Sequence, residues 1–196
     1  MNSVKTYMLL LLLMINGVQF ATAQLLMFDI FIGGKVVGEM QVEKKLQGSL
    51  EQYSMKSSME VNLFKKMINE FTINVEYING KLTYSYFENY LNQDLKEKTI
   101  IQTKQGKLSV TKEDDHYFIG EVPFSIIRAY FEKPTGQKVL FSERLGEFLD
   151  LKKESENAYK LKVGMMKESH FYYQDNKCVK VEGKFGPTSF TFLRQK

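Results

Sequence analysis

The sequence predicts an all-β fold class: one curved antiparallel meander sheet, an open or closed barrel of about ten to twelve strands, with one short helix at about 123–132. Three observations predict it. Apolar and polar residues alternate along most of the chain, tight-turn residues such as Asn79-Gly80 separate the alternating stretches, and only one segment shows helical spacing. Alternation with a period of two is typical of strands that bury one face, and Asn-Gly is a strong hairpin signal.

Residues 1–23 are expected to form a signal peptide and not part of the fold. Lys5 supplies a charged start, residues 8–15 are an unbroken apolar run, and Ala21 and Ala23 are the small residues before a cleavage site at Ala23 and Gln24. This order is the pattern of an export signal. The apolar run is shorter than the roughly 20 residues that a membrane-spanning helix needs.

Cleavage there leaves residues 24–196 as a single β domain, which is long enough to fold without disulfides. We expect this domain to be periplasmic or secreted. No cysteine lies near the cleavage site, so a lipoprotein is not expected, and no later apolar run suits an integral membrane protein. The net charge is only +4 and the lysines are dispersed, which argues against a nucleic-acid partner.

The expected strands follow the alternating stretches in chain order. Those of the first half are 26–32, 36–42, 53–63, 67–77, 82–90, 100–101 and 108–110, and those of the second half are 159–163, 171–173, 179–181 and 190–192. Turn residues such as Gly33-Gly34 and Asp175-Asn176 separate them. A flat meander of this length would leave an apolar face uncovered, so we expect the sheet to curl.

The segment 122–133 is the one that breaks the period of two. Phe124, Ile127 and Phe131 fall at helical spacing, Pro123 suits a first helical turn, and Pro134 would stop the helix. We expect a helix of roughly two to three turns that packs on the sheet and divides the strands into two halves of one domain.

The aromatic content leaves two interpretations of the interior open. The chain has 15 Phe, 11 Tyr and 10 Met but no Trp. Such side chains either fill a core or line an adaptable pocket for a lipid or another apolar or amphipathic ligand.

Three stretches carry a resemblance to a known family. Residues 28–40 (FDIFIGGKVVGEM) resemble the opening hairpin of an uncharacterised family of exported Gram-negative all-β proteins, and 125–134 (SIIRAYFEKP) and 141–148 (FSERLGEF) resemble its later motifs. The resemblance spans the mature chain and implies a curved antiparallel sheet, distantly analogous to the open barrels of periplasmic lipoprotein carriers. The family has no assigned reaction, so no functional residue is carried over.

Candidate ligand-binding residues come from two places. Glu88 shares a strand face with Tyr84, Tyr86 and Tyr90 if the alternation continues, and a bulge would instead turn Glu88 outward. Arg128 lies inside the predicted helix beside Tyr130. An ion pair of this arginine with Glu143 or Glu147 would be architectural, whereas a free guanidinium at the barrel mouth would hold an anionic head group.

The motifs of common catalytic and cofactor sites do not occur in the sequence. His116 and His170 do not have metal-site spacing, so no catalytic residue, metal or cofactor is expected.

Cys178 is the single cysteine, so no internal disulfide forms, and alternation places it on a surface face with Lys180 and Glu182.

The function expected from these observations is that of an exported non-enzymatic binding or carrier-type domain for an apolar or amphipathic ligand. The alternative is an envelope protein-interaction module with a filled core. A third interpretation is an envelope enzyme that uses acidic residues such as Glu88, Glu113 or Asp114.

Overall fold

The structure is a computed structural model that describes residues 22–62, 66–163, 167–185 and 188–196. Within these ranges the chain forms fourteen β-strands, all in one sheet, and one short 3-10 helix, η1 (Arg128–Tyr130). The strands are β1 (Thr22–Ile32), β2 (Lys35–Gln47), β3 (Leu50–Asn62), β4 (Lys66–Ile78), β5 (Lys81–Leu91), β6 (Asp94–Lys104), β7 (Lys107–Lys112), β8 (Asp115–Ile119), β9 (Val139–Ser142), β10 (Glu147–Ser155), β11 (Ala158–Lys162), β12 (Glu168–Gln174), β13 (Lys177–Phe185) and β14 (Thr188–Arg194).

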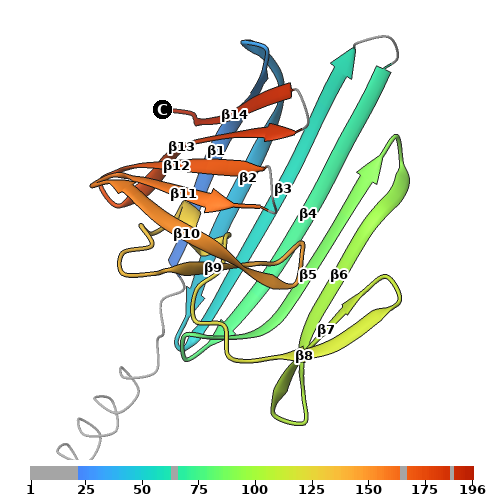
Figure 1. Ribbon diagram of the computed structural model, residues 1–196, viewed down its shortest axis with the longest axis vertical. Helices are drawn as coiled ribbons and strands as arrows, with labels where there is room; N and C mark the ends of the chain where they lie inside the picture. Colours follow the sequence, from blue (N-terminus) through green and yellow to red (C-terminus); the bar gives the residue numbers. More distant parts are fainter. Residues whose placement is uncertain (1–21, 63–65, 164–166, 186–187) are drawn as a thin grey trace, which may run out of the picture.

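The sheet is an antiparallel meander that starts in its middle. The spatial order is β8-β7-β6-β5-β4-β3-β2-β1-β14-β13-β12-β11-β10-β9, so β1 pairs with β14 and the strands β8 and β9 are the two edges. Residues 120–138 connect these edges. In Figure 1 the orange and red strands β10–β14 cross in front of the blue-to-green strands, which shows how strongly the open sheet curls.

The predicted fold class is confirmed, with two differences in detail. The described residues contain fourteen strands and not ten to twelve, because β8, β9 and β10 form in stretches where no alternating pattern was identified. The helix expected at 123–132 is only the 3-10 turn η1. Its first half is extended along β9, where Ile126 N–H donates to Phe141 O and Phe141 N–H donates to Phe124 O, so these backbone groups serve a neighbouring strand.

The predicted hairpin at Asn79-Gly80 is present. Both residues have positive φ (53° and 75°), as a tight two-residue turn between twisted strands requires. In the strands on either side, buried and more exposed residues alternate: Ile73, Val75 and Tyr77 of β4 are buried between outward neighbours. The register of the hairpin shifts between Glu76 and Tyr77, so that Leu82 is buried whereas Tyr84 points outward.

Side chains fill the inner face of the curled sheet. Tyr130 of η1 lies edge-on to Phe28 of β1 (5.4 Å between ring centroids) and to Phe171 of β12 (6.0 Å). The neighbouring Phe131 contacts the ring of Tyr53 on β3 at 5.7 Å. The connection 120–138 thus packs into the concave side and joins the two halves of the sheet in one core.

Cys178 is buried in this core, which corrects the expected surface position. The pairing of β12 with β13 shifts between Tyr172 and Tyr173, so Tyr173 lies opposite the buried Cys178, where an unshifted register would place Val179. A register irregularity of this kind moves side chains from one face to the other. Burial raises the pKa of the thiol to about 12.

Candidate functional site

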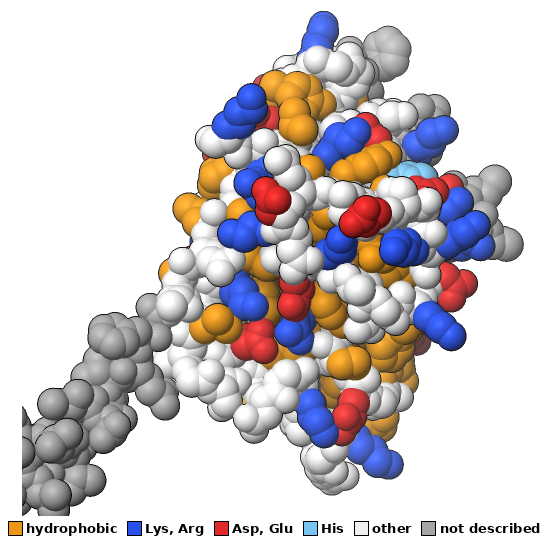
Figure 2. Space-filling model, turned by 90° about the vertical axis from the view of Figure 1, so that its left-hand side faces the viewer, with side chains coloured by type: hydrophobic (Ala, Val, Ile, Leu, Met, Phe, Trp, Pro, Cys, Tyr) orange, Lys and Arg blue, Asp and Glu red, His pale blue; other side chains and the backbone are white. Residues whose placement is uncertain are grey.

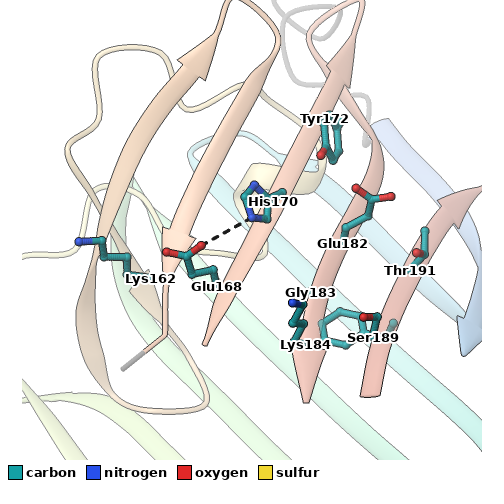
Figure 3. A pocket seen from close by; sticks show the side chains of 10 residues that line it. Lys162, Glu168, His170, Tyr172, Glu182, Gly183, Lys184, Ser189 and Thr191 are labelled. Carbon is teal, nitrogen blue, oxygen red and sulfur yellow. Dashed lines mark ion pairs between the residues drawn. The ribbon is translucent and has the colours of Figure 1, made fainter. Parts of the chain in front are cut away.

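A hollow lies over the second half of the sheet, at β11–β14. Its volume is about 850 Å³. Figure 3 shows His170 and Tyr172 of β12, Glu182 of β13 and Thr191 of β14 side by side along it. Lys162 and Phe190 also line it.

The strand pattern explains why these polar side chains gather. On β12, Phe171 and Tyr173 are buried, so the residues between and before them, His170 and Tyr172, point to the other face. His170 lies directly opposite Glu182, and Glu182 lies directly opposite Thr191 in the next strand. Three strands thus contribute one polar residue each to a continuous row across the sheet.

His170 is held by carboxylates but keeps one ring nitrogen open. Its Nδ1 lies 2.9 Å from Oε2 of Glu154, whereas its Nε2 lies 3.9 Å from Oε2 of Glu168. Glu168 is itself paired with Lys160 at 3.1 Å. Because 3.9 Å exceeds hydrogen-bond length, Nε2 is left to bond a ligand that enters the hollow.

Tyr172 forms the second polar anchor of the hollow. Burial and a hydrogen bond to Glu182 raise its pKa, so the phenol stays protonated. Lys180 lies 4.1 Å from the centroid of the tyrosine ring and 3.0 Å from Oε1 of Glu182. This lysine lowers the pKa of Glu182, which therefore remains a charged acceptor. The hollow can accept and donate hydrogen bonds beside an aromatic surface.

Mixed charge is a general property of the surface. On the face that Figure 2 shows, Lys and Arg side chains are interspersed with Asp and Glu, with hydrophobic side chains between them. In the part of the chain that the structure describes, no group of three His, Cys, Asp or Glu residues could hold a metal ion. Those same residues contain no helix long and apolar enough to cross a membrane.

The structure brings the predicted tyrosines and Glu88 together on the outer face of β5. Ser85 and Phe87 between them are buried, and Glu88 Oε2 accepts hydrogen bonds from Tyr86 at 2.8 Å and Tyr90 at 3.2 Å. Tyr84 lines a smaller hollow of about 310 Å³ on the same face. Their role in binding stays a prediction.

Arg128 and Tyr130 lie elsewhere, in the connection that fills the concave side, so the predicted residues form two groups. Arg128 donates from Nε to Glu132 at 2.9 Å and from Nη1 to Pro123 O at 2.7 Å, and its Nη2 is 3.6 Å from Glu51. The expected pairing with Glu143 or Glu147 is wrong, because the guanidinium is engaged by these three groups and stacks over the rings of Tyr77 and Phe124.

Glu143 is instead buried against the turn before η1. Its Oε1 accepts a hydrogen bond from Ile127 N–H at 3.0 Å. Burial raises the pKa of this carboxyl, although hydrogen bonds from Ser125 and from backbone N–H groups act in the opposite direction. The carboxyl therefore caps a backbone segment and does not pair with a cation.

Sequence reasoning missed the hollow over β11–β14. The alternation in Ser169-His170-Phe171-Tyr172 indicates that His170 and Tyr172 point outward. The neighbours Glu154 and Glu182 come from other strands, and only the pairing of β11, β12 and β13 places them beside the histidine. The local signal existed, but the cluster depends on strand order.

The comparisons with known proteins support a β-barrel-like fold. The family model "Domain of unknown function (DUF6134)" matches residues 28–195. The "Crystal Structure of Beta-barrel-like Protein of Domain of Unknown Function DUF1849 from Brucella abortus" has a TM-score of 0.60 and 10% sequence identity, and the match covers 92% of this chain and 98% of that chain. At this identity the likeness shows the fold alone. No curated protein matches the sequence.

Proposed function

The chain belongs to DUF6134, a family of domains of unknown function, and we propose that it is a non-enzymatic binding protein that acts outside the cytoplasm. Its ligand occupies the hollow over β11–β14. The observation that carries this proposal is the contrast between a concave side filled by core side chains and a polar hollow of about 850 Å³ on the same sheet. A pocket with a few convergent polar groups is the usual form of a small-molecule site.

The lining indicates an amphipathic ligand. His170 and Tyr172 offer hydrogen-bonding atoms to a polar part, while the rings of Tyr172 and Phe190 offer apolar surface. The carboxylates of Glu168 and Glu182 are already paired with Lys160 and Lys180, so the site does not demand a cationic ligand.

Export belongs to the same proposal. Cleavage between Ala23 and Gln24 would remove only the exposed beginning of β1, because Leu26 is the first buried residue of that strand. The pairs of Thr22 with Leu46 and of Ala23 with Lys45 would be lost, and those from Gln24 onward would remain. The family match begins at residue 28, after this site. Loss of residues 1–23 is therefore compatible with an intact core.

A second candidate function is protein binding at an edge of the sheet. Within the described residues β8 pairs only with β7, and its Phe118 is 53% exposed. Such an edge can accept a strand from another protein. A photo-crosslinking residue at Phe118, compared with one at Gln47, tests this function in the native envelope. A specific protein adduct at position 118 supports it, and equal or no labelling contradicts it.

Native mass spectrometry of the protein purified from its own envelope tests the main proposal. The wild type is expected to carry a bound small molecule. Thr191→Trp, which places a large ring in the hollow, is expected to lose it, and Gln47→Trp at a distant exposed position is expected to keep it. A wild type without bound mass, or a Thr191→Trp variant that retains it, contradicts the proposed site.

A further inference from the structure

We propose that the outer face of β4–β6 is a second binding site, for a neutral glycan chain, with Tyr84, Tyr86 and Tyr90 as its aromatic contacts. These three residues lie on one face of β5, opposite to buried Ser85 and Phe87. The site is distinct from the hollow over β11–β14, because its own hollow shares no lining residue with that one and β1 lies between them in the sheet. It does not rest on the proposed function.

The tyrosines form a row of the length of an oligosaccharide. Successive outward residues of a strand are about 7 Å apart, so the row from Tyr84 to Tyr90 extends over about 20 Å. All three tyrosines are half-buried, so each ring has supporting contacts and retains exposed surface. A strand holds such a row straight, which suits a linear ligand.

Glu88 fixes the middle of the row. Its Oε2 accepts hydrogen bonds from both Tyr86 and Tyr90, at 2.8 Å and 3.2 Å. The hydrogen bond to Glu88 raises the pKa of Tyr86 to about 12, so the phenol remains a neutral donor. A carboxylate with one oxygen engaged by two phenols still has its other oxygen to accept a ligand hydroxyl.

A hollow beside Tyr84 supplies the polar half of the site. It measures about 310 Å³ and extends over β2–β5. Within it Gln52 Nε2 donates to Glu76 Oε1 at 2.9 Å, and Asn74 lies opposite Tyr86 in the neighbouring strand. Side-chain amides donate and accept hydrogen bonds and carboxylates accept them, so together they can serve the hydroxyl groups of a sugar.

The charges of this face favour a neutral ligand. Lys45 is paired with Glu43 at 3.1 Å, and Glu88 lies directly opposite Lys98 in the adjacent strand. Lys98 also lies 5.4 Å from the centroid of the Tyr86 ring. With Glu76, which lines the hollow, these residues number three glutamates and two lysines, so an anionic polymer is disfavoured there, whereas a neutral glycan can pack its C–H faces on the rings.

Affinity electrophoresis of the full chain tests the site with four embedded polymers: dextran, hydroxyethyl cellulose, galactomannan and the anionic alginate. At least one neutral polysaccharide is expected to retard the protein. Tyr84→Ala and Tyr86→Ala should each weaken that binding about tenfold, which is the effect of one lost ring contact. Tyr86→Phe keeps the ring and should change binding by about twofold at most.

Phe148→Ala is the matched control, because it removes an exposed aromatic ring from the other half of the sheet. It should leave glycan binding unchanged. The proposal is overturned if none of the neutral polymers retards the protein, if only alginate does so, or if folded Tyr84→Ala and Tyr86→Ala bind as the wild type does. Loss of binding in Phe148→Ala alone would also overturn it.

Discussion

Arg144 and Glu97 join the β9 end of the open sheet to strand β6 through their side chains. The guanidinium donates from Nε to Oε2 and from Nη2 to Oε1 of the carboxylate, both at 2.6 Å. Glu97 lies on β6 and Arg144 in the turn after β9, which is an edge strand at the far end of the strand order. Thr99 Oγ1 adds a hydrogen bond of 2.7 Å to the carbonyl of Arg144. These side-chain hydrogen bonds form a corner that links β6 to the turn after β9, which backbone pairing does not join.

Arg144→Ala is expected to destabilise the protein by about 1 kcal/mol, because a bidentate ion pair on a partly exposed surface is worth about that much. Chemical denaturation at neutral pH measures it. Lys81→Ala, which breaks the more exposed Lys81–Glu121 pair, serves as the control and should leave the midpoint nearly unchanged. Equal midpoints for Arg144→Ala and the wild type would contradict the role of the corner.

The same pair predicts an acid dependence. The hydrogen bond from Arg144 holds the pKa of Glu97 below its usual value of 4.5, against the effect of burial. A lowered pKa contributes stability that is present above about pH 4.5 and is lost as the pH falls through the folded-state value. Unfolding free energies measured between pH 6 and 3 should therefore fall less steeply in Arg144→Ala. An identical slope in both proteins would contradict this assignment.

Glu143 should show the opposite dependence, because burial raises its pKa above 4.5. Its contribution is full below that value and declines as the pH rises through the folded-state pKa. Glu143→Gln keeps an acceptor for Ile127 N–H and should remove this decline. Glu143→Ala leaves the buried N–H unpaired and should cost about 2–3 kcal/mol. Denaturation curves of the two variants and the wild type at pH 4 and 8 measure both effects. A Glu143→Ala variant as stable as the wild type would contradict the role of this carboxyl as a cap.

Cys178 should be unreactive in the folded protein. Its thiol is buried and its pKa is raised to about 12, so almost no thiolate is present at pH 8. Labelling with a thiol reagent should require unfolding, whereas Gln174→Cys, at an exposed position nearby, should label at once. Rapid labelling of the wild type under native conditions would show that β13 does not bury this residue.

Export predicts one new N-terminus. Expression of the whole sequence in a Gram-negative host should yield an envelope protein that begins at Gln24, as N-terminal sequencing and intact mass would show. Ala23→Leu replaces the small residue before the cleavage site and should leave the precursor uncut. Retention of the uncut wild type in the cytoplasm would contradict the export signal.

Short-range features of the fold were predictable from sequence, and those that depend on distant strands were not. Asn79-Gly80 specifies its hairpin by local backbone preference, and the strand expected at 67–77 is β4 (Lys66–Ile78) within a residue at each end. Glu143 and Arg128 lie close together in sequence but take different partners, because Glu143 caps Ile127 and Arg128 reaches Glu51 of β3. Pairing of this kind follows from strand order, which alternation does not encode.

The candidate site likewise combines features that one strand determines with features that depend on several strands. The common face of Tyr84, Tyr86 and Glu88 follows from their spacing on one strand. The cluster around His170 needs Glu154 and Glu182 from two further strands, so its hollow could not be predicted. Cys178 was misplaced because a shift in register between β12 and β13 leaves no clear sign in the sequence.

Hydrogen–deuterium exchange tests the central claim, that the ligand is held in the hollow over β11–β14 and not inside the filled core. The protein isolated from its own envelope would be compared with residues 24–196 produced in the cytoplasm of a foreign host. The account predicts extra protection of the envelope-derived protein in peptides of β12–β14 around His170, Glu182 and Thr191. Protection confined to the core peptides of β1–β4 and residues 122–131, or no difference between the two proteins, would contradict it.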